Sequence, residues 1–455
     1  MIIMKFGGTS VQNEEAIENV ISIVRSRLRE RPLVVVSALA RVTRLLCEIA
    51  DEAEAQHEDR VRELLAGVRE RHVELAGNLL ADRPELLREC MEKLDHRFSR
   101  LESFVGGVCR IGELSPRSEA RIISNGELLS SIIAGYAFNA RGVSCKWLDA
   151  RKMVVTDENY MSARPDLDAT EANVRRAVAE EGKGADVVIT QGFIASSSEG
   201  FTSVLGFEGS DYSAAIFGMA LGATRVEIWT DVDGIRTADP RTVGDTQRIE
   251  KVSYEEAAEM AAMGARVLHP LTIEPARKKN IPILVLNSTR TDCPGTVVTR
   301  SDEVPDGPKS VAVKDDILFI TVKSPKLIGV TGMLGKVFAQ MTAGNIPVVM
   351  ATASESEVYL TVPREKDGLE EGLDDALKGL SRWADVTVFR DKAQISVIGR
   401  GMISFEGLGD RVISLAGRVS MVSLGTNLLS ESFVIDRDKL PGTLQGLHDY
   451  IFAKP

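Results

Sequence analysis

The chain has 455 residues, enough for roughly three domains of ordinary size. Hydrophobic residues make up 44% and charged residues 27%, with 16 prolines, a composition that excludes global disorder and collagen-like or low-complexity scaffolds. The net charge of -11, from 55 Lys plus Arg against 66 Asp plus Glu, has the wrong sign for a protein that binds nucleic-acid phosphates, so we expect no nucleic-acid partner.

Cysteine and histidine spacing excludes several kinds of site. The 5 cysteines form no CxxC pair and the 5 histidines no HxxxH pair, so we predict neither a disulfide framework nor a zinc site, and a reducing cytoplasm as the location. Apolar runs fall short of the roughly 18 residues that span a bilayer. The opening residues MIIMKFGG lack the pattern of a secretory signal. We therefore expect no membrane association.

Short apolar runs alternate with longer amphipathic segments over the first 300 residues. Runs rich in β-branched residues, without polar alternation, predict strands covered on both faces at 2–6, 33–36, 143–148, 187–190, 225–230 and 283–285. Helical periodicity predicts helices at 14–29, 212–221 and 255–262, and a charged helical stretch over 52–104 within an insertion at about 48–118. This alternation predicts an α/β catalytic domain over residues 1–300.

A Pro/Gly/acid cluster, SDEVPDGPK at 301–309, marks a domain boundary. After it, strands predicted at 318–322, 347–352 and 358–362 recur at 394–398, 420–424 and 432–435, an offset of about 74 residues, with a helical segment between the first two strands of each copy. We predict two modules of ββαββα or βαββα type, at 310–385 and 386–455. Each is small enough to need its twin or a partner subunit to bury its sheet.

The turn after the first strand carries the strongest local signal for a ligand site. There Lys5 and Phe6 lead into Gly7 and Gly8, ahead of a helix. Two glycines let backbone N–H groups approach an anion, a helix N-terminus adds positive potential, and a lysine supplies a mobile charge for a phosphate. Gly-Gly turns after strands are also common without a ligand, so spacing alone leaves both interpretations open.

Three further polar turns flank predicted elements. Ser124 and Glu127 have the spacing of a helix capping box, which is the favoured interpretation of that turn alone. Asp211 at the start of a predicted helix could cap it, or could hold a lysine or a metal-bound phosphate. Thr230 and Asp231 follow a strand, where α/β folds bind ligands.

Together these clusters resemble the signatures of aspartate kinases, members of the amino-acid kinase fold. The matching strings, in that family's order, are KFGGTSV at 5–11, VSA at 36–38 with Thr43, SNGE at 124–127, QGF at 191–193, GSDYSAA at 209–215, TDVDGI with ADPR at 230–241 and GARVLHP at 264–270. The C-terminal duplication resembles the family's tandem ACT domains, which bind amino-acid effectors. Each string alone is weak, whereas their shared order is specific.

The resemblance implies a three-layer α/β/α amino-acid kinase domain followed by two ferredoxin-like ACT domains of βαββαβ type. It also implies transfer of the γ-phosphoryl group of ATP to the side-chain carboxylate of L-aspartate, the first step toward lysine, threonine and methionine. That carboxylate is already ionised at neutral pH, so catalysis needs positioning and charge neutralisation rather than a general base. We expect Mg²⁺ to arrive with ATP and no protein side chain to bind a metal.

Individual residues acquire roles by the same resemblance. Lys5 is implied to stabilise the transferring phosphoryl group, Asp211 to orient Lys5, and Glu127 to pair with the substrate ammonium group. The implied substrate contacts are Ser37, Thr43, Glu127, Phe193 and Ser210. The implied nucleotide contacts are Lys5, Phe6, Gly7, Gly8, Ser10, Thr230, Asp231, Arg236, Arg241, Arg266 and Val267, with Arg266 in place of a family lysine. The implied effector positions are Met333, Leu334, Val349, Ser354 and Glu355.

Two departures from the family pattern stand out. The family usually reads TLGRGGSD where this chain reads VLGFEGSD at 204–211, so Phe207 replaces an arginine that is thought to bind a substrate carboxylate. A neighbouring arginine (Arg117, Arg121 or Arg151) could replace it, the substrate could differ, or the enzyme could be weak; we favour the first. Lysine-inhibited members commonly carry Asp at the position of Val349, which cannot pair with an ammonium group. The effector, if there is one, therefore stays open.

Two other functions stay open as hypotheses. One is a related amino-acid kinase that acts on glutamate, N-acetylglutamate or another carboxylate. The other is a catalytically weak or idle amino-acid sensor that keeps the fold. Retention of Lys5, Glu127 and Asp211 disfavours the sensor, because an idle site has no physical need for these three charges. We expect a homodimer or higher homo-oligomer, assembled through the ACT sheets.

Overall fold

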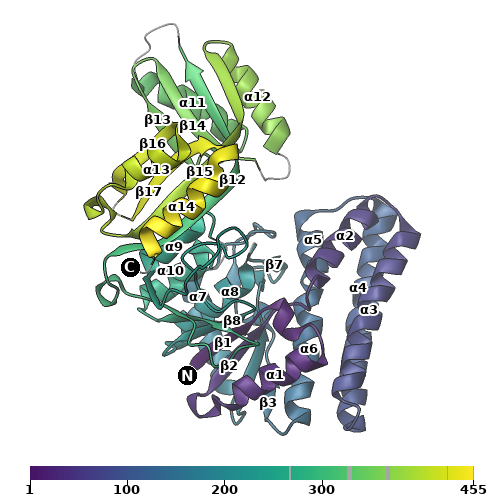
Figure 1. Cartoon of the computed structure of the whole chain (residues 1–455). Coiled ribbons are helices and arrows are strands. Elements are labelled where there is room, and N and C mark those ends of the chain that lie inside the picture. The colour runs from purple at the N-terminus through teal and green to yellow at the C-terminus, as the bar shows by residue number, and fades with distance from the viewer. Residues whose placement is uncertain (207, 266–267, 325–329, 365–368, 428, 454–455) are drawn as a thin grey trace. The chain divides into compact units, whose positions relative to one another are not determined.

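A computed structural model describes residues 1–206, 208–265, 268–324, 330–364, 369–427 and 429–453 of the chain (Figure 1). The chain divides into two compact units, the first made of residues 1–235, 248–258 and 266–304, the second of 236–247, 259–265 and 305–455. Two short segments within the first 300 residues thus belong to the second unit. In the described part of the chain, no helix is both long and apolar enough to cross a membrane.

An eight-stranded sheet forms the centre of the first unit, with the order β3-β5-β2-β1-β8-β10-β11-β9. The first six of these strands are parallel neighbours, whereas β11 runs antiparallel to β10. Their bounds are β1 Ile2–Phe6, β2 Pro32–Val36, β3 Cys145–Trp147, β5 Val187–Gln191, β8 Val226–Thr230, β9 Lys251–Ser253, β10 Ile283–Asn287 and β11 Thr296–Thr299. Every residue of β1, β2 and β5 is buried, as the unalternating apolar runs predict.

Helices cover both faces of this sheet. Gly218 of α8 lies against Ile3 and Val226, whereas Gly135 of α6 lies against Ile189, which is in one row with Met4. Successive residues of a strand point to opposite faces, so α6 and α8 lie on opposite sides and the unit has three α/β/α layers. The bounds of α6 and α8 are Asn125–Ala140 and Gly209–Leu221, and α7 (Leu167–Glu180) and α10 (Pro270–Lys278) pack against α8. The other helices are α1 Glu14–Arg25 and α9 Tyr254–Ala262.

The predicted helical insertion consists of α2 (Val42–Glu54), α3 (Glu58–Leu79), α4 (Pro84–Ile111) and α5 (Pro116–Ile123), seen together at the right of Figure 1. A second, three-stranded sheet has the order β4-β6-β7, with bounds Val155–Thr156, Ile194–Ser197 and Thr202–Val204. These strands are too short for a periodicity to be read from the sequence, and they were not predicted.

The second unit is built on one six-stranded antiparallel sheet of order β13-β14-β12-β15-β17-β16. Its strands are β12 Gly307–Lys323, β13 Met350–Ala353, β14 Glu357–Pro363, β15 Asp385–Arg400, β16 Val419–Asn427 and β17 Ser430–Asp436. Its helices are α11 Val330–Ala343, α12 Leu369–Ser381, α13 Leu408–Ala416 and α14 Leu440–Phe452.

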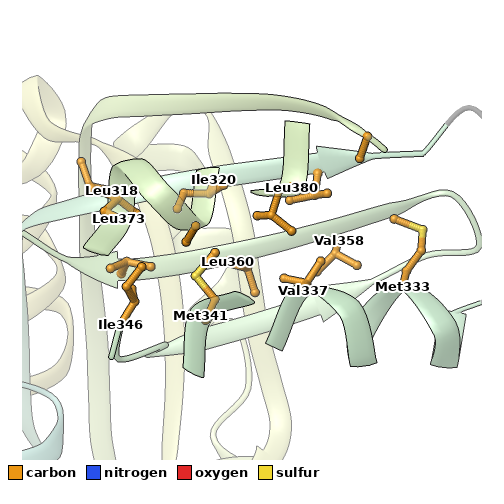
Figure 2. Close-up of a cluster of buried hydrophobic side chains, with 14 residues drawn as sticks. Leu318, Ile320, Met333, Val337, Met341, Ile346, Val358, Leu360, Leu373 and Leu380 are labelled. Carbon is orange, nitrogen blue, oxygen red and sulfur yellow. The ribbon is translucent and has the colours of Figure 1, made fainter. Parts of the chain in front are cut away.

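Two long strands, β12 and β15, are shared by both halves of this sheet. Residues 317–323 of β12 pair with 385–392 of β15, whereas residues 307–314 pair with 394–400. The first half therefore has the succession βαββαβ from β12 to β15, with the buried core shown in Figure 2, to which α11 contributes Val337 and Met341. The second half takes its fourth strand from the beginning of β12. The predicted boundary between 385 and 386 falls inside β15, because a continuous strand leaves no break in the sequence.

Candidate active site

The carboxyl ends of five parallel strands meet at one edge of the large sheet. After β1, β2, β5, β8 and β10 the next residues are Gly7, Ser37, Gly192, Asp231 and Ser288. The strand β1 lies between β2 and β8, so the strands that follow β1 in the sequence lie on both sides of it and the strand order reverses there. Open α/β sheets bind ligands in the crevice outside such a reversal of strand order.

Lys5 and Asp211 form a largely buried ion pair at this edge. Lys5 lies on β1 and Asp211 in the first turn of α8, and Lys5 Nζ lies 2.5 Å from Asp211 Oδ1. Their side chains are only 11% and 10% exposed. The structure therefore brings together the two residues for which the sequence predicted a catalytic role, with the lysine ammonium held in one place by the carboxylate.

The glycine turn after β1 is wedged between neighbouring loops. A β-carbon on Gly8 would lie 2.9 Å from the carbonyl oxygen of Ala38, so only glycine fits without a shift of the backbone. The N–H of Ala40 donates to the carbonyl of Gly8 at 3.1 Å. One turn of 3-10 helix, Gly8–Val11, follows, and Ser10 Oγ donates to Ser288 Oγ at 3.0 Å. These contacts fix the turn between the loops that follow β2 and β10.

Phe6, the last residue of β1, is fully buried below this turn. Its ring stacks on that of Trp229, at a centroid distance of 6.0 Å. The side chain of Phe6 therefore supports the turn, and only its backbone is left to contact a nucleotide.

Three of the predicted substrate contacts also lie together. Ser37 Oγ donates to Ser210 Oγ at 2.9 Å, and the N–H of Ala38 donates to Glu127 Oε1 at 3.2 Å. Ser130 Oγ donates to the carbonyl of Ser37 at 2.7 Å, which fixes the loop after β2 to α6. Thr43 is half-buried in the first turn of α2, and its predicted contact with substrate stays a prediction.

Glu127 has an unusual environment for a carboxylate. Burial raises its pKa to about 8, and Oε2 has no hydrogen-bond partner among the described residues. The predicted capping box with Ser124 is wrong, because Ser124 Oγ donates to the carbonyl of Arg121 and makes no capping bond. Ser124 joins α5 to α6 with a helical backbone (φ −60°, ψ −16°), so it does not take the extended conformation of an N-cap residue. Glu127 is left free to turn inward.

The turn after β5 presses against the start of α8. A β-carbon on Gly192 would lie 2.6 Å from Cβ of Ser210, and Phe193 follows with a left-handed φ of 66°. The N–H of Phe193 donates to Ser213 Oγ at 2.9 Å. A bulky residue in this conformation is uncommon and occurs where the surrounding structure enforces it. Phe193 thus lies beside Gly209, at the start of α8, and its contact with substrate stays a prediction.

Thr230 and Asp231 lie at the end of β8, on the other side of β1. Thr230 Oγ1 donates to Asp231 Oδ1 at 3.2 Å, and the N–H of Ser288 donates to the carbonyl of Thr230 at 2.8 Å. Ser288 therefore connects this loop with Ser10. It was missed from the sequence, although its position directly after a parallel strand could have identified it.

The structure does not test the roles of several other predicted residues. Arg236 and Arg241 belong to the second unit, where Arg236 Nε donates to Thr246 Oγ1 at 2.8 Å and Arg241 pairs with Asp239 at 2.6 Å. Their nucleotide contacts stay predictions. Phe207, Arg266 and Val267 lie outside the described residues.

The three arginines considered as replacements at Phe207 have partners of their own. Arg117 lies over the ring of Phe201, Arg121 lies over the ring of Phe104, and Arg151 pairs with Asp149 at 2.6 Å. By contrast, Arg71 of the helical insertion donates from Nη1 to the carbonyl of Ala40 at 2.7 Å, beside the glycine turn. Arg71 was missed because a charged residue on a long helix gives no signal of what it contacts.

The predicted effector positions all lie in the second unit. Met333 is fully buried in the core of the first half-sheet (Figure 2), and Leu334 packs against the same cluster. Val349 is partly buried and packs against Ile317 and Phe319 with their neighbours. Ser354 and Glu355 are exposed in the turn before β14. Any contact of Met333 with an effector would therefore come from its backbone rather than its side chain.

A metal site made of protein side chains is not found in the described part of the chain, where no three His, Cys, Asp or Glu residues are grouped suitably. The charged groups at the carboxyl edge include the Lys5 ammonium and the carboxylates of Asp211, Glu127 and Asp231. This arrangement suits a ligand that brings its own cation, such as a metal-bound phosphate, together with a small ammonium compound.

Comparison with known proteins agrees with this geometry. The model of the amino acid kinase family matches residues 1–287. Lysine-sensitive aspartokinase 3 of Escherichia coli K12 is 32% identical over 462 residues, covering 99% of each chain. A chloroplastic bifunctional aspartokinase/homoserine dehydrogenase 2 of Arabidopsis thaliana is 30% identical over 465 residues, of which 98% of this chain and 50% of the relative are covered. The chain thus spans about half the length of that bifunctional relative.

Solved structures show the same likeness over the whole chain. Crystal structures of E. coli aspartokinase III match with TM-scores of 0.86 for the R-state complex with aspartate and ADP and 0.82 for the T-state complex with lysine and aspartate. Both are 31% identical to this chain and cover 99% of it, and the match covers 100% and 99% of the two crystallised chains.

Proposed function

Because this chain belongs to the aspartokinases of the amino acid kinase family, we propose that it transfers the γ-phosphoryl group of MgATP to the side-chain carboxylate of L-aspartate. The observation that carries the proposal is the buried Lys5–Asp211 pair next to the linked residues Ser37, Ser210 and Glu127, all at the carboxyl edge of the sheet. One edge thus holds a cation for a phosphoryl group and an acceptor for an ammonium group.

The chemistry expected of these residues is electrostatic. In-line transfer places negative charge on the equatorial oxygens of the phosphoryl group, and Lys5 is positioned to stabilise that charge. Asp211 holds the ammonium of Lys5 in one orientation, so the cation need not reorganise during the reaction. The backbone of Gly7 and Gly8 provides close approach for phosphate oxygens, and Mg²⁺ enters bound to the nucleotide. Ser37 and Ser210 offer hydroxyl groups to aspartate.

Glu127 is the expected partner of the substrate ammonium group. Only the ionised carboxylate attracts a cation, and burial raises the pKa of this group to about 8 in the free protein. Aspartate binding at neutral pH should therefore remove a proton from Glu127, so that the ammonium and the carboxylate meet as an ion pair.

This ionisation makes a testable pH dependence. Below pH 8 the KM for aspartate should rise by about tenfold for each unit that the pH falls, and above pH 8 it should become constant. Calorimetry in buffers of different ionisation enthalpy should detect the release of roughly one proton per aspartate bound at pH 7. A KM that is constant between pH 6 and 8 would show that Glu127 is not the ammonium partner.

The substrate itself is tested by measuring ADP release. With MgATP, we expect the kcat/KM of L-aspartate to be at least about a hundredfold above those of the N-acetyl derivatives of aspartate and glutamate, because Glu127 can pair only with a free ammonium group. L-Glutamate should also be a poorer substrate, because its extra methylene moves the side-chain carboxylate away from the phosphoryl group when its ammonium group is bound. Preference for an N-acetyl acid would contradict the assignment of Glu127 and indicate a different amino-acid kinase. Absence of turnover with all four acids would favour the sensor.

The second unit is the expected place for regulation. An amino-acid effector would bind to its ACT-like halves, and assembly into a homodimer through these sheets agrees with their small individual cores. The effector of this chain stays a separate question, because Val349 offers no carboxylate for a lysine ammonium group.

A further inference from the structure

The residues grouped at the carboxyl edge of the sheet leave one group of the proposed substrate without a cationic partner. L-Aspartate carries one ammonium group and two carboxylates. Its side-chain carboxylate receives the phosphoryl group and its ammonium is expected at Glu127, so the α-carboxylate needs a partner of its own. Lys5 is held by Asp211, and Ser37 and Ser210 offer only neutral hydroxyl groups. A carboxylate that leaves water without a cation or several hydrogen bonds is costly, so the site requires a further positive group.

Arg71 is a cation that reaches the loop after β2 from the helical insertion. It lies on α3 at the spacing of one helical face from Val68 and Leu75, which are both buried, and is itself half-buried. Its Nη1 donates to the carbonyl of Ala40 at 2.7 Å. Among the described residues this carbonyl is its only hydrogen-bond partner, although a guanidinium has several further N–H donors. Arg71 therefore has donors left for a ligand.

A second arginine lies beside the same carbonyl. Arg41 follows Ala40 directly, is exposed, and has a left-handed φ of 70°, a conformation that glycine adopts with far less strain. Neither Arg41 nor Arg71 pairs with a carboxylate among the described residues. Burial and the charge of Arg41 lower the pKa of Arg71. Like charges without a carboxylate are unfavourable in the free protein, so this arrangement indicates that a ligand supplies the anion.

The loop after β2 connects Arg71 with the expected ammonium site. The N–H of Ala38 donates to Glu127 Oε1 at 3.2 Å, whereas Arg71 bonds to the carbonyl of Ala40, two residues further on. Two residues of chain span at most about 7 Å. The ammonium and the α-carboxylate of an amino acid are attached to the same carbon, so their partners must lie close together. Glu127 and Arg71 contact the loop at points close enough for one such head group to reach both.

We propose that Arg71 binds the α-carboxylate of L-aspartate, and so takes the place of the arginine that the aspartate kinase pattern has where this chain has Phe207. A guanidinium can donate two parallel N–H groups to one carboxylate, which neither a lysine nor a hydroxyl group can do. Arg71 is then a specificity-determining residue, which selects amino acids with a free α-carboxylate. This inference rests on the proposed kinase function.

Loss of the guanidinium should weaken the binding of aspartate but not of ATP. Arg71→Met keeps an unbranched side chain in the half-buried position, so its KM for aspartate should rise by about ten- to a hundredfold, while its KM for ATP changes by less than about threefold. Arg71→Lys keeps the charge without the planar fork, so its KM for aspartate should lie between those of Arg71→Met and the wild type.

The matched control removes another arginine from the same helix. Arg62 of α3 is exposed and pairs with Asp59 at 2.9 Å. Exposed pairs of this kind contribute little to stability, so Arg62→Met should leave both KM values unchanged.

A substrate analogue separates direct contact from damage to the fold. The α-amide of L-aspartate has the shape of aspartate but no charge at the α-position. With the wild type, the kcat/KM of L-aspartate should exceed that of the α-amide by at least about tenfold. With Arg71→Met the two values should agree within about threefold, because the group that distinguishes the two compounds is gone. A variant that is merely misfolded would lower both values and keep their ratio.

Three results would overturn the inference. These are a KM for aspartate in Arg71→Met within about threefold of the wild type, a ratio of aspartate to α-amide that is the same in wild type and variant, and a rise in the KM for ATP alone. The last result would assign Arg71 to a phosphate group near Gly8, whose carbonyl accepts the N–H of Ala40.

Turnover of aspartate by the wild-type enzyme tests the proposed function independently, because it does not depend on which residue binds the α-carboxylate. If the wild type were inactive, calorimetric binding of L-aspartate and its α-amide to the wild type and to Arg71→Met would still decide the role of Arg71. Equal binding of L-aspartate to both proteins would contradict that role.

Discussion

A Lys5→Ala variant should lose at least about a hundredfold in kcat, the largest effect expected of any substitution in this chain. The ammonium of Lys5 is the cation held at the end of β1, and its pairing with Asp211 keeps it in place without solvent reorganisation. Removal of the charge leaves negative charge on the phosphoryl group uncompensated in the transition state. Single-turnover measurement with MgATP and aspartate reports this loss directly.

Stability has to be separated from catalysis in that experiment. Both side chains of the pair are about nine-tenths buried, and loss of one partner from such a pair can cost about 3–5 kcal/mol of folding free energy. The variant Lys5→Ala with Asp211→Asn removes both charges, so its melting temperature should lie closer to that of the wild type. If this folded double variant kept a kcat within about fivefold of the wild type, Lys5 would not be the phosphoryl-stabilising residue.

The second large effect is expected from Glu127→Gln, which should raise the KM for aspartate by about ten- to a hundredfold. Glutamine keeps an oxygen for the N–H of Ala38 but cannot pair ionically with an ammonium group. The pH dependence of the KM below pH 8 should disappear in the same variant, because the titrating group is gone. Both changes are measured in one series of initial rates from pH 6 to 9.

Although it should bind aspartate more weakly, the Glu127→Gln variant should be more stable than the wild type at neutral pH. Burial raises the pKa of Glu127 from 4.5 to about 8. The unfolded chain therefore releases this proton at a lower pH than the folded protein does, so the free energy of unfolding falls as the pH rises from about 4.5 to 8. An uncharged amide avoids this loss, and at pH 7 the gain could reach about 3 kcal/mol. Lower stability with normal kinetics would return Glu127 to a purely structural role. Glu119→Gln, in the neighbouring α5, is the matched control for a carboxyl of raised pKa outside the site.

The first strand and its turn could be predicted because local chemistry determines them. An apolar β-branched run predicts a buried strand, and the bounds Ile2–Phe6 are confirmed. Two glycines after such a strand permit close packing, which the contact of Gly8 with Ala38 shows. Lys5 and Asp211 lie far apart in the sequence, so only the family resemblance indicated that the two side chains would form a pair.

The role of Glu127 was predicted less well from the residues alone. Glu127 has the spacing of a capping box, and the sequence alone favoured that interpretation. Ser124 has a helical backbone between α5 and α6 and makes no capping bond, and this junction cannot be read from spacing.

The sequence also did not show which compact unit each segment belongs to. A boundary near residue 300 follows from a Pro/Gly/acid cluster, but nothing local shows that segments 236–247 and 259–265 belong to the second unit. Val243 and Ala238 are small apolar residues that join the core of the second half-sheet with Val311 and Phe433. The loop carrying Arg236 and Arg241 is therefore held by that core, and its distance from Thr230 could not be inferred from sequence order.

The most direct test of the proposed function is to trap the acyl phosphate that it requires. The purified full-length protein is incubated with MgATP, L-aspartate and hydroxylamine, which converts an acyl phosphate to a hydroxamate, and the product is identified by mass spectrometry. We predict the hydroxamate of the aspartate side-chain carboxyl, formed in equal amount to ADP and absent with the folded double variant of Lys5 and Asp211. Formation of ADP without hydroxamate, or hydroxamate at the α-carboxyl, would contradict phosphoryl transfer to the side-chain carboxylate.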